Sequence, residues 1–278
     1  MLEGNIVSLA PDETIVAFAN ALADAARPVA MRYFRAAPEV EIKADLSPVT
    51  VADRSVEATL REMIASRFPG HGIVGEEFGG QDRDRDHVWV IDPIDGTQSF
   101  IVGSPMFGVL IALLHRGRPV LGIIDHPALG QRWLGVQGRP TLLDGRPVQV
   151  SACTDLAAAR FLTNSPHYYT MPAEPAALAS LHEATRFTSY GMECHGFGLV
   201  ASGYADLIVE TGLDIFDYLA AVPVIEGAGG VISDWAGQPL TIDSGRTVLA
   251  AGSAALHAEA VSLLARDGIR PSAEQGWT

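Results

Sequence analysis

The sequence predicts a mixed α/β (α+β) protein made of two lobes. Its 278 residues, 48% of them hydrophobic, are enough for one large domain or two lobes that share a core. Apolar residues recur at helical spacing near both ends of the chain, and short β-branched runs separated by turn residues lie between them. We therefore expect an N-terminal lobe of residues 1–150 and a C-terminal lobe of residues 151–278.

The net charge of −14, from 19 basic and 33 acidic residues, limits the partners of this chain. A field of this sign repels nucleic acid and anionic membranes, so we expect neither as a partner. It also repels an anionic substrate unless bound cations invert the local field. A protein of this composition that acts on phosphate should therefore need metal ions.

Cysteine and hydropathy patterns favour a cytoplasmic protein. Cys153 and Cys194 are far apart and lack CxxC spacing, which argues against a disulfide scaffold and suits a reducing compartment. The apolar run Met106–Leu114 is much shorter than the ~20 residues of a membrane span. No basic segment followed by an apolar core marks a signal peptide. The eight histidines are too scattered to predict a zinc cluster.

Two helices are expected in the first 70 residues. Apolar residues three to four positions apart predict an amphipathic helix over Asp12–Arg35, which Pro28 should kink or split. Residues 43–53 predict a loop, and Ser55–Phe68 predicts the second helix. Asp53 lies just before that helix, where an N-cap is the simplest role for it.

The chain is organised around Val88–Phe100, which reads VWVIDPIDGTQSF. Val88–Ile91 has the composition of a buried strand. We expect this strand to stop at Asp92, because Pro93 removes a backbone donor and fixes φ. Asp95–Thr97 then predicts a tight turn, so two carboxylates would lie on one stiff bend.

This bend suits a hard divalent cation. Mg²⁺ prefers oxygen ligands, and Asp92, Asp95 and the carbonyl of Ile94 can supply them. The N–H groups of Gly96 and Thr97 would point outward and could bind a phosphate group. A plain acidic surface turn also fits these residues, because Asp-Gly is a common turn signal.

Neighbouring segments predict strands of an antiparallel sheet. Ile73–Glu77 predicts a strand ending in two acids, of which at most one can join a site because adjacent side chains point in different directions. Phe107–Leu114 and Pro119–Asp125, joined by Arg116–Arg118, predict a β-hairpin.

The remaining elements alternate between strands and helices. In order, we expect strands at Arg132–Val136 and Pro147–Val150, a strand at Ala159–Leu162, a helix at Glu174–Thr185, a Gly-rich helix at Gly191–Ala205, a strand at Asp206–Glu210, a helix at Ile215–Gly227, strands at Val231–Asp234 and Thr247–Ala251, and a helix at Ser253–Arg266.

Three motifs in this order resemble the inositol monophosphatase family: GEE at Gly75–Glu77, DPIDGT at Asp92–Thr97, and an acid, Asp217, that opens a late helix. The resemblance runs from Lys43 to about Asp234. It implies a layered αβαβα sandwich of the inositol monophosphatase / fructose-1,6-bisphosphatase-like type. It also implies a Mg²⁺-dependent, lithium-sensitive phosphatase of small phosphate monoesters, with two or three ions per site, that forms homodimers.

The same resemblance assigns roles to single residues. The implied metal ligands are Glu76, Asp92, the carbonyl of Ile94, Asp95 and Asp217. Asp53 and Thr97 would orient the attacking water and help to deprotonate it, in place of the capping role of Asp53. Lys43 lies where the family can carry a basic residue near the metal site. The hypothesis is in-line attack by a water that the ions activate, without a phospho-enzyme.

Longer segments look like the histidinol-phosphate phosphatase branch of the family. They are Trp89–Leu114, Gly122–Pro127 and Tyr218–Trp235. The resemblance implies hydrolysis of L-histidinol phosphate to L-histidinol and phosphate, a step of histidine biosynthesis. Gln98, where this branch often has Lys, and Glu193, where Asp is commoner, depart from its pattern.

A histidinol phosphate pocket should present acids away from the metal ions, because this substrate carries an ammonium group and an imidazole. Glu193, Glu210 and Asp214 are the candidates, although each could also be a surface acid on an acidic protein. Two alternatives stay open. One is an inositol 1-phosphate or broad small-molecule phosphatase, and the other is a non-catalytic metal-binding regulatory protein with the same fold.

Overall fold

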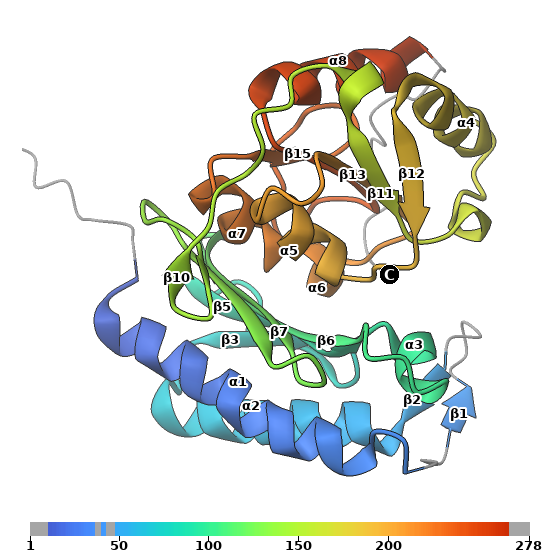
Figure 1. The fold of residues 1–278 in the computed structure, drawn as a ribbon. Coiled ribbons are helices and arrows are strands. Elements are labelled where there is room, and N and C mark those ends of the chain that lie inside the picture. The colour runs from blue at the N-terminus through green and yellow to red at the C-terminus, as the bar shows by residue number, and fades with distance from the viewer. Residues whose placement is uncertain (1–10, 37–39, 43–47, 267–278) are drawn as a thin grey trace, which may run out of the picture.

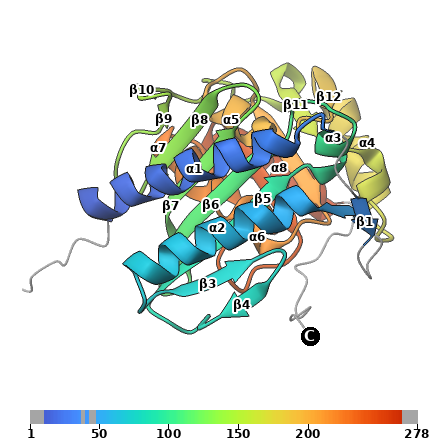
Figure 2. The same ribbon diagram turned by 90° about the horizontal axis from the view of Figure 1, so that it is seen from below.

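The computed structural model describes residues 11–36, 40–42 and 48–266, which form five layers in the order αβαβα (Figure 1). The predicted layered sandwich is confirmed. The helical layers are α1 (Glu13–Tyr33) with α2 (Val51–Arg67), then α5 (His195–Ala201) with α6 (Ile215–Tyr218) and α7 (Ala221–Gly227), then α4 (Glu174–Ala184) with α8 (Ala254–Arg266). Figure 2 shows α1 and α2 lying side by side across the larger sheet.

The larger sheet has eight strands in the order β10-β9-β8-β7-β6-β5-β3-β4. They are β3 (Gly72–Gly75), β4 (Gly79–Gln81), β5 (His87–Asp95), β6 (Gly108–His115), β7 (Arg118–His126), β8 (Gln131–Val136), β9 (Leu142–Leu143) and β10 (Arg146–Pro147). All neighbours are antiparallel except β3 and β5. The β6–β7 pair confirms the predicted hairpin.

The smaller sheet has five strands in the order β12-β11-β13-β15-β14. They are β11 (Arg160–Thr163), β12 (Phe187–Tyr190), β13 (Leu207–Thr211), β14 (Val231–Ser233) and β15 (Thr247–Ala251). Shorter elements complete the fold: the β1–β2 pair (Val40–Ile42 and Pro48–Thr50), α3 (Thr97–Ile101), and the 3₁₀ turns η1 (Leu156–Ala158) and η2 (Pro166–Tyr168).

Apolar side chains fill the spaces between the layers. Trp89 belongs to the cluster between α1, α2 and the larger sheet. Trp133 and Tyr218 belong to the cluster that joins the other face of this sheet to the middle helices. Phe161 and Leu256 belong to the cluster between the smaller sheet, α4 and α8. Burial of such side chains is the main stabilising contribution to a fold of this kind.

Two glycines let the middle helices lie directly on the larger sheet. A Cβ atom on Gly122 of β7 would be 1.9 Å from the carbonyl oxygen of Ala220. A Cβ atom on Gly135 of β8 would be 2.3 Å from the carbonyl carbon of Pro223. Because only glycine permits this approach, the segment that carries Asp217 is held close to the strands of the larger sheet.

Two expectations for the first 70 residues are wrong. The first helix is not split, since α1 continues through Pro28, whose missing N–H removes only one internal hydrogen bond. Part of the expected loop 43–53 is ordered structure, because β2 ends at Thr50 and α2 begins at Val51. Residues 43–47, Lys43 among them, lie outside the described residues.

The strand that carries the central motif is longer than expected. β5 does not stop at Asp92 but passes through Pro93 and ends at Asp95. Its register with β6 shifts between Asp92 and Asp95, as in a β-bulge. A bulge accommodates proline because the extra residue is not paired in the ladder.

Three expected elements of the second half differ in the structure, and a fourth element, β12, was not foreseen. Only His195–Ala201 of the expected helix 191–205 is helical, because Gly191 (φ 75°) and Glu193 (φ 46°) are in the left-handed region. The helix expected over 215–227 is divided into α6 and α7. The strand expected at Pro147–Val150 is the two-residue β10, and β12 was not foreseen.

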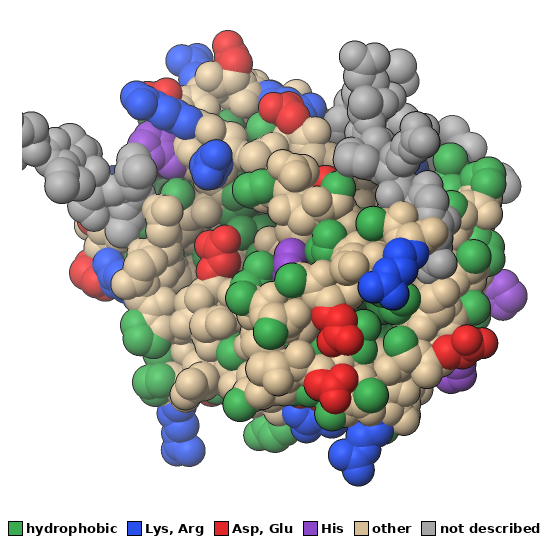
Figure 3. Space-filling model, turned by 90° about the horizontal axis from the view of Figure 1, so that it is seen from above, with side chains coloured by type: hydrophobic (Ala, Val, Ile, Leu, Met, Phe, Trp, Pro, Cys, Tyr) green, Lys and Arg blue, Asp and Glu red, His purple; other side chains and the backbone are tan. Residues whose placement is uncertain are grey.

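The surface over α4 and α8 carries acidic and basic side chains interspersed with hydrophobic ones (Figure 3). Within the part of the chain that the structure describes, every helix is too short or too polar to cross a membrane. A cytoplasmic location and the absence of nucleic-acid and membrane partners stay predictions.

Candidate active site

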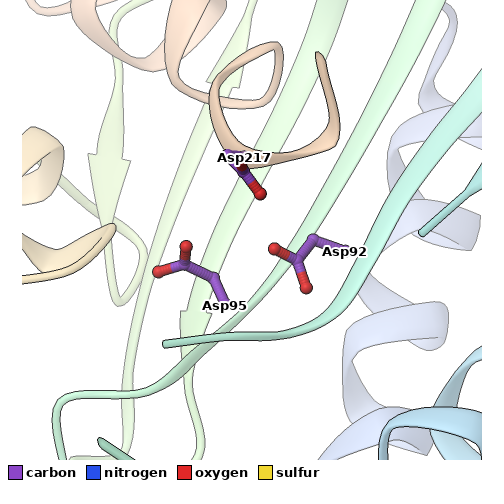
Figure 4. A group of neighbouring side chains, drawn as sticks. All are labelled: Asp92, Asp95 and Asp217. Carbon is purple, nitrogen blue, oxygen red and sulfur yellow. The ribbon is translucent and has the colours of Figure 1, made fainter. Parts of the chain in front are cut away.

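Three carboxylates from distant parts of the sequence converge where β5 ends. Asp92 and Asp95 come from the bulged end of β5, and Asp217 comes from α6. One oxygen of each lies within 4.8 Å of the others. Figure 4 shows their side chains directed toward a shared space. The structure thus brings together three of the residues expected to bind metal.

Each of these carboxylates is oriented by one backbone amide. The three hydrogen bonds run from Ile94 N–H to Asp92 Oδ1 (3.0 Å), from Cys194 N–H to Asp95 Oδ2 (2.7 Å), and from Asp214 N–H to Asp217 Oδ2 (2.7 Å). An amide donor fixes one oxygen and favours the charged form of the group. Within residues 11–36, 40–42 and 48–266, no basic side chain forms an ion pair with any of the three carboxylates, so backbone amides hold them in place.

Burial and mutual repulsion raise the pKa of all three acids. Burial, and after it the charge of Glu76, raises the pKa of Asp92 well above its ordinary value. Burial and the charge of Glu193 raise the pKa of Asp95 to about 7. Burial and the charge of Asp95 raise the pKa of Asp217. Such a group is stable only with bound protons or a bound cation, and its oxygen donors fit a hard divalent ion.

Asp95 and Asp217 of this cluster line a cavity of about 230 Å³. Its lining combines acids, amides, a tyrosine and the turn after β5: Glu76, Asp95, Gly96, Thr97, Gln98, Asn164, Tyr168, Glu193, Thr211, Gly212, Leu213 and Asp217. A larger cavity of about 370 Å³ lies against Arg27 and Arg132, but both guanidinium groups already bind the buried Asp125. The smaller cavity is therefore the candidate active site.

Thr97 lines this cavity, and the buried Asp53 lies next to it. The hydroxyl of Thr97 is 3.4 Å from Asp53 Oδ1 and 3.2 Å from the carbonyl oxygen of Ile94. The other oxygen of Asp53 accepts the N–H of Thr50 (2.9 Å), and Thr50 is the N-cap of α2. Asp53 is therefore the third residue of a capping box and not the N-cap, and it can serve the helix and the site together.

The three acids expected to bind substrate lie in different places. Glu193 lines the cavity, and its Oε1 accepts the hydroxyl of Ser99 (2.9 Å). Burial raises the pKa of Glu193. Glu210 is buried in β13, with 2% of its surface exposed, and neither it nor Asp214 is part of the cavity lining. A substrate-binding role for these two acids stays a prediction.

The turn that carries Glu76 depends on a residue that sequence reasoning missed. Glu57 of α2 is fully buried, and its Oε2 accepts the N–H of Glu77 (2.7 Å). Its Oε1 accepts the N–H of Phe78 (3.2 Å) and Nε of Arg61 (2.7 Å). This ionic anchor fixes the backbone on which Glu76 lies. The sequence feature that could have revealed Glu57 is the presence of a glutamate on the apolar face of a predicted helix.

The comparison with known families decides the identity of the fold. A model described as the inositol monophosphatase family matches residues 12–267. The chain belongs to the inositol monophosphatase family. The resemblance found in the sequence is thereby confirmed. By family it is a metal-dependent phosphatase that acts on small phosphate monoesters, and Asp92, Asp95 and Asp217 form the acidic cluster in which metal can bind.

Individual members of the inositol monophosphatase family match over most of their length. The bifunctional phosphatase IMPL2, chloroplastic, of Arabidopsis thaliana is 42% identical over 261 residues, 91% of this chain and 75% of that protein. A histidinol-phosphatase of Chlorobaculum parvum is 38% identical over 224 residues, 80% of this chain and 86% of that protein. An inositol monophosphatase structure from Zymomonas mobilis has 40% identity and a TM-score of 0.84, covering 91% of this chain and 98% of that one.

We expect the metal-free protein to lose stability as the pH rises. The folded state holds a proton on Asp95 with a pKa of about 7, whereas the ordinary pKa of an aspartate is 3.8. This contribution is complete below pH ~4 and is lost as the pH rises through ~7. Urea unfolding in EDTA should therefore give a falling free energy of unfolding across this range, and excess Mg²⁺ should restore it most at high pH. Asp95→Asn should make the fall with pH smaller, with Asp92 and Asp217 accounting for the remainder, and a flat wild-type profile in EDTA would contradict the expectation.

Glu57→Gln should weaken Mg²⁺ binding without unfolding the protein. The carboxylate of Glu57 accepts hydrogen bonds from two backbone N–H groups and from the guanidinium of Arg61, whereas a glutamine side chain has only one acceptor oxygen. The substitution should therefore loosen the turn that carries Glu76. Loss of such a supporting contact typically lowers metal affinity about 10–100-fold. Calorimetric Mg²⁺ titration measures the change, and Glu62→Gln, an exposed acid on the same helix, is the matched control. Equal affinities in both variants would exclude this role of Glu57.

Proposed function

We propose that this chain is a Mg²⁺-dependent phosphatase that hydrolyses L-histidinol phosphate to L-histidinol and phosphate. One observation carries the proposal: Asp95 and Asp217 of the carboxylate cluster line the cavity, and a further, half-buried acid, Glu193, belongs to the same lining together with Tyr168. The cluster suits cations that bind phosphate. Glu193 and the tyrosine ring suit an ammonium group and an imidazole.

The donor set fits Mg²⁺. Glu76, Asp92, Asp95, Asp217 and the carbonyl of Ile94 would hold the ions, all through oxygen, which Mg²⁺ prefers. When bound, the ions would neutralise the charge on the phosphoryl oxygens and lower the pKa of a water molecule. The protein contributes the orientation of the carboxylates through the amides of Ile94, Cys194 and Asp214.

Thr97 and Asp53 give the attacking water a route for its proton. A water beside Thr97 can donate to Oγ1 of the threonine while the threonine hydroxyl donates to Asp53 Oδ1, 3.4 Å away. Asp53 stays in place because its other oxygen is bound to the N–H of Thr50. In this mechanism the phosphoryl group passes directly to water, and no side chain forms a covalent intermediate.

Specificity comes from the part of the cavity beyond the carboxylate cluster. The bond from Ser99 holds Oε1 of Glu193 and orients the carboxylate, which lines the cavity. Gly96 must lack a side chain here, since a Cβ atom would be 2.8 Å from Cγ of Glu193. Asn164 and Tyr168, from the segment after β11, complete this wall and were not foreseen from the sequence.

Inositol 1-phosphate is the second candidate substrate. The 40% identity and the TM-score of 0.84 to the inositol monophosphatase of Zymomonas mobilis favour it. Asn164 and Thr211 in the lining could also form hydrogen bonds with hydroxyl groups. Two or three ions per site, a homodimer and a cytoplasmic location are part of the proposal for either substrate.

Phosphate release from histidinol phosphate and inositol 1-phosphate, measured side by side with and without Mg²⁺, tests the proposal. We expect the larger kcat/KM for histidinol phosphate and no turnover in EDTA. Asp92→Asn should lower kcat on the order of 10²–10³-fold, as for loss of one electrostatic stabiliser, while Asp84→Asn, an exposed acid, should behave as wild type. A preference for inositol phosphate would replace the proposed substrate, and Mg²⁺ binding without release of phosphate from either would favour a regulatory role.

Glu193→Gln tests the basis of specificity. The amide keeps the shape of the side chain but removes the charge that would bind the ammonium or imidazolium group. A hydrogen bond to a charged group contributes about 1.5–3 kcal/mol, so the preference for histidinol phosphate over inositol phosphate should fall about tenfold or more. The ratio of the two kcat/KM values measures it, with Glu183→Gln on the exposed face of α4 as control. An unchanged ratio would show that Glu193 does not select the substrate.

A further inference from the structure

Three histidines lie in a row at the opposite end of β5 from the acidic cluster. His87 begins β5 and is paired across the antiparallel ladder with His115, the last residue of β6. His71 directly precedes β3, whose parallel register with β5 places it level with His87. The ring centroids of His71 and His87 are 4.9 Å apart, and those of His87 and His115 are 4.7 Å apart with planes only 6° from parallel.

His71 is not available as a metal ligand in this row. Its Nδ1 accepts the indole N–H of Trp89 at 3.1 Å. Because an indole nitrogen can only donate, Nδ1 of His71 must carry the lone pair, and the proton of the neutral ring is then on Nε2. Neither nitrogen of His71 has a free lone pair while this bond to the buried Trp89 is present.

The ring nitrogens of His87 and His115, unlike those of His71, are not engaged by a hydrogen bond from another residue in the described part of the chain. Both are half-buried, and no hydrogen bond joins their ring nitrogens to any residue in the described ranges 11–36, 40–42 and 48–266. The charged groups beside them are Asp86 and Arg116, which pair with each other at 3.4 Å. Burial and the neighbouring His115 lower the pKa of His87, so its imidazole is neutral at physiological pH.

We propose that His87 and His115 form a cross-strand binding site for one divalent transition ion of the Zn²⁺ or Cu²⁺ class, with water completing the coordination. Neutral imidazole suits these ions, whereas Mg²⁺ prefers the oxygen ligands at the other end of the strand. With metal–nitrogen bonds of about 2.0–2.1 Å, one ion can bridge two nitrogens up to about 4 Å apart. The two rings are stacked at a centroid distance of 4.7 Å, so both side chains must rotate about χ1 and χ2 to turn one nitrogen of each toward a shared ion.

This site is separate from the candidate active site. Asp92 lies five positions along β5 from His87, which corresponds to roughly 17 Å at the rise of a strand. The inference uses none of the residues assigned to phosphate hydrolysis and does not depend on the proposed function. Its ligands come from two neighbouring strands, so a bound ion would also link the start of β5 to the end of β6.

Titration of the full-length protein with Cu²⁺ in the presence of excess Mg²⁺ tests the proposal. We expect one ion per chain with two imidazole nitrogens in the electron paramagnetic resonance spectrum. His87→Asn and His115→Asn should each weaken binding about tenfold or more, since even changes to supporting groups cost that much. His71→Phe should retain the ion, and so should His167→Asn, which removes an exposed histidine elsewhere.

Three results would overturn the proposal. They are unchanged affinity in both asparagine variants, fewer than two coordinated imidazoles in the wild type, and a loss in His71→Phe equal to that in His115→Asn. Thermal unfolding of each variant shows whether it is folded. The wild-type spectrum decides the question even where a variant is not, because it counts the nitrogen ligands directly.

Discussion

The structure depends on the repulsion among carboxylates that share one buried space. Asp92, Asp95 and Asp217 approach within 4.8 Å with no basic side chain bound to any of them in the described part of the chain. Left alone, like charges at this distance would move apart or take up protons. Their positions persist because the backbone amides that orient them belong to a rigid framework. A cation is then bound where the fold has already placed its ligands.

That framework explains several local features of the chain. The bulge at Pro93 directs Asp92 and Asp95 to one side of the strand end, and Gly122 allows the helix segment with Asp217 to approach the sheet. Glu57 performs the same task for the turn of Glu76, using a buried ion pair with Arg61. Breaking such a pair is costly, because the remaining charge is left uncompensated. Stability and the geometry of the site are therefore supported by the same contacts.

The local pattern of the sequence was sufficient to predict a bend that carries Asp92 and Asp95, whereas the layered fold and the role of Asp217 were predicted from the family resemblance of the motifs. The failures have tertiary causes. A proline seemed to end β5, but pairing with β6 on both sides of a bulge continues it. One Gly-rich helix was expected over 191–205, but Glu193 is in the left-handed region and its side chain lies over Gly96 instead. Tyr168 and the row of histidines lie in no recognisable motif, since only strand register and a loop after β11 bring them into place.

The charge of Glu193 links the two parts of the cavity. It is the charge that contributes most, after burial, to the raised pKa of Asp95, so it also opposes ionisation of a proposed metal ligand. A cationic substrate group beside Glu193 would cancel its negative charge and so favour the charged form of Asp95. The charged form of Asp95 in turn favours binding of cations and of the phosphate that they hold. A neutral polyol placed there would leave the repulsion intact. A positive charge on the alcohol portion of the phosphate monoester would therefore match the electrostatics of this cavity, and this match is the physical basis of the proposed substrate, histidinol phosphate.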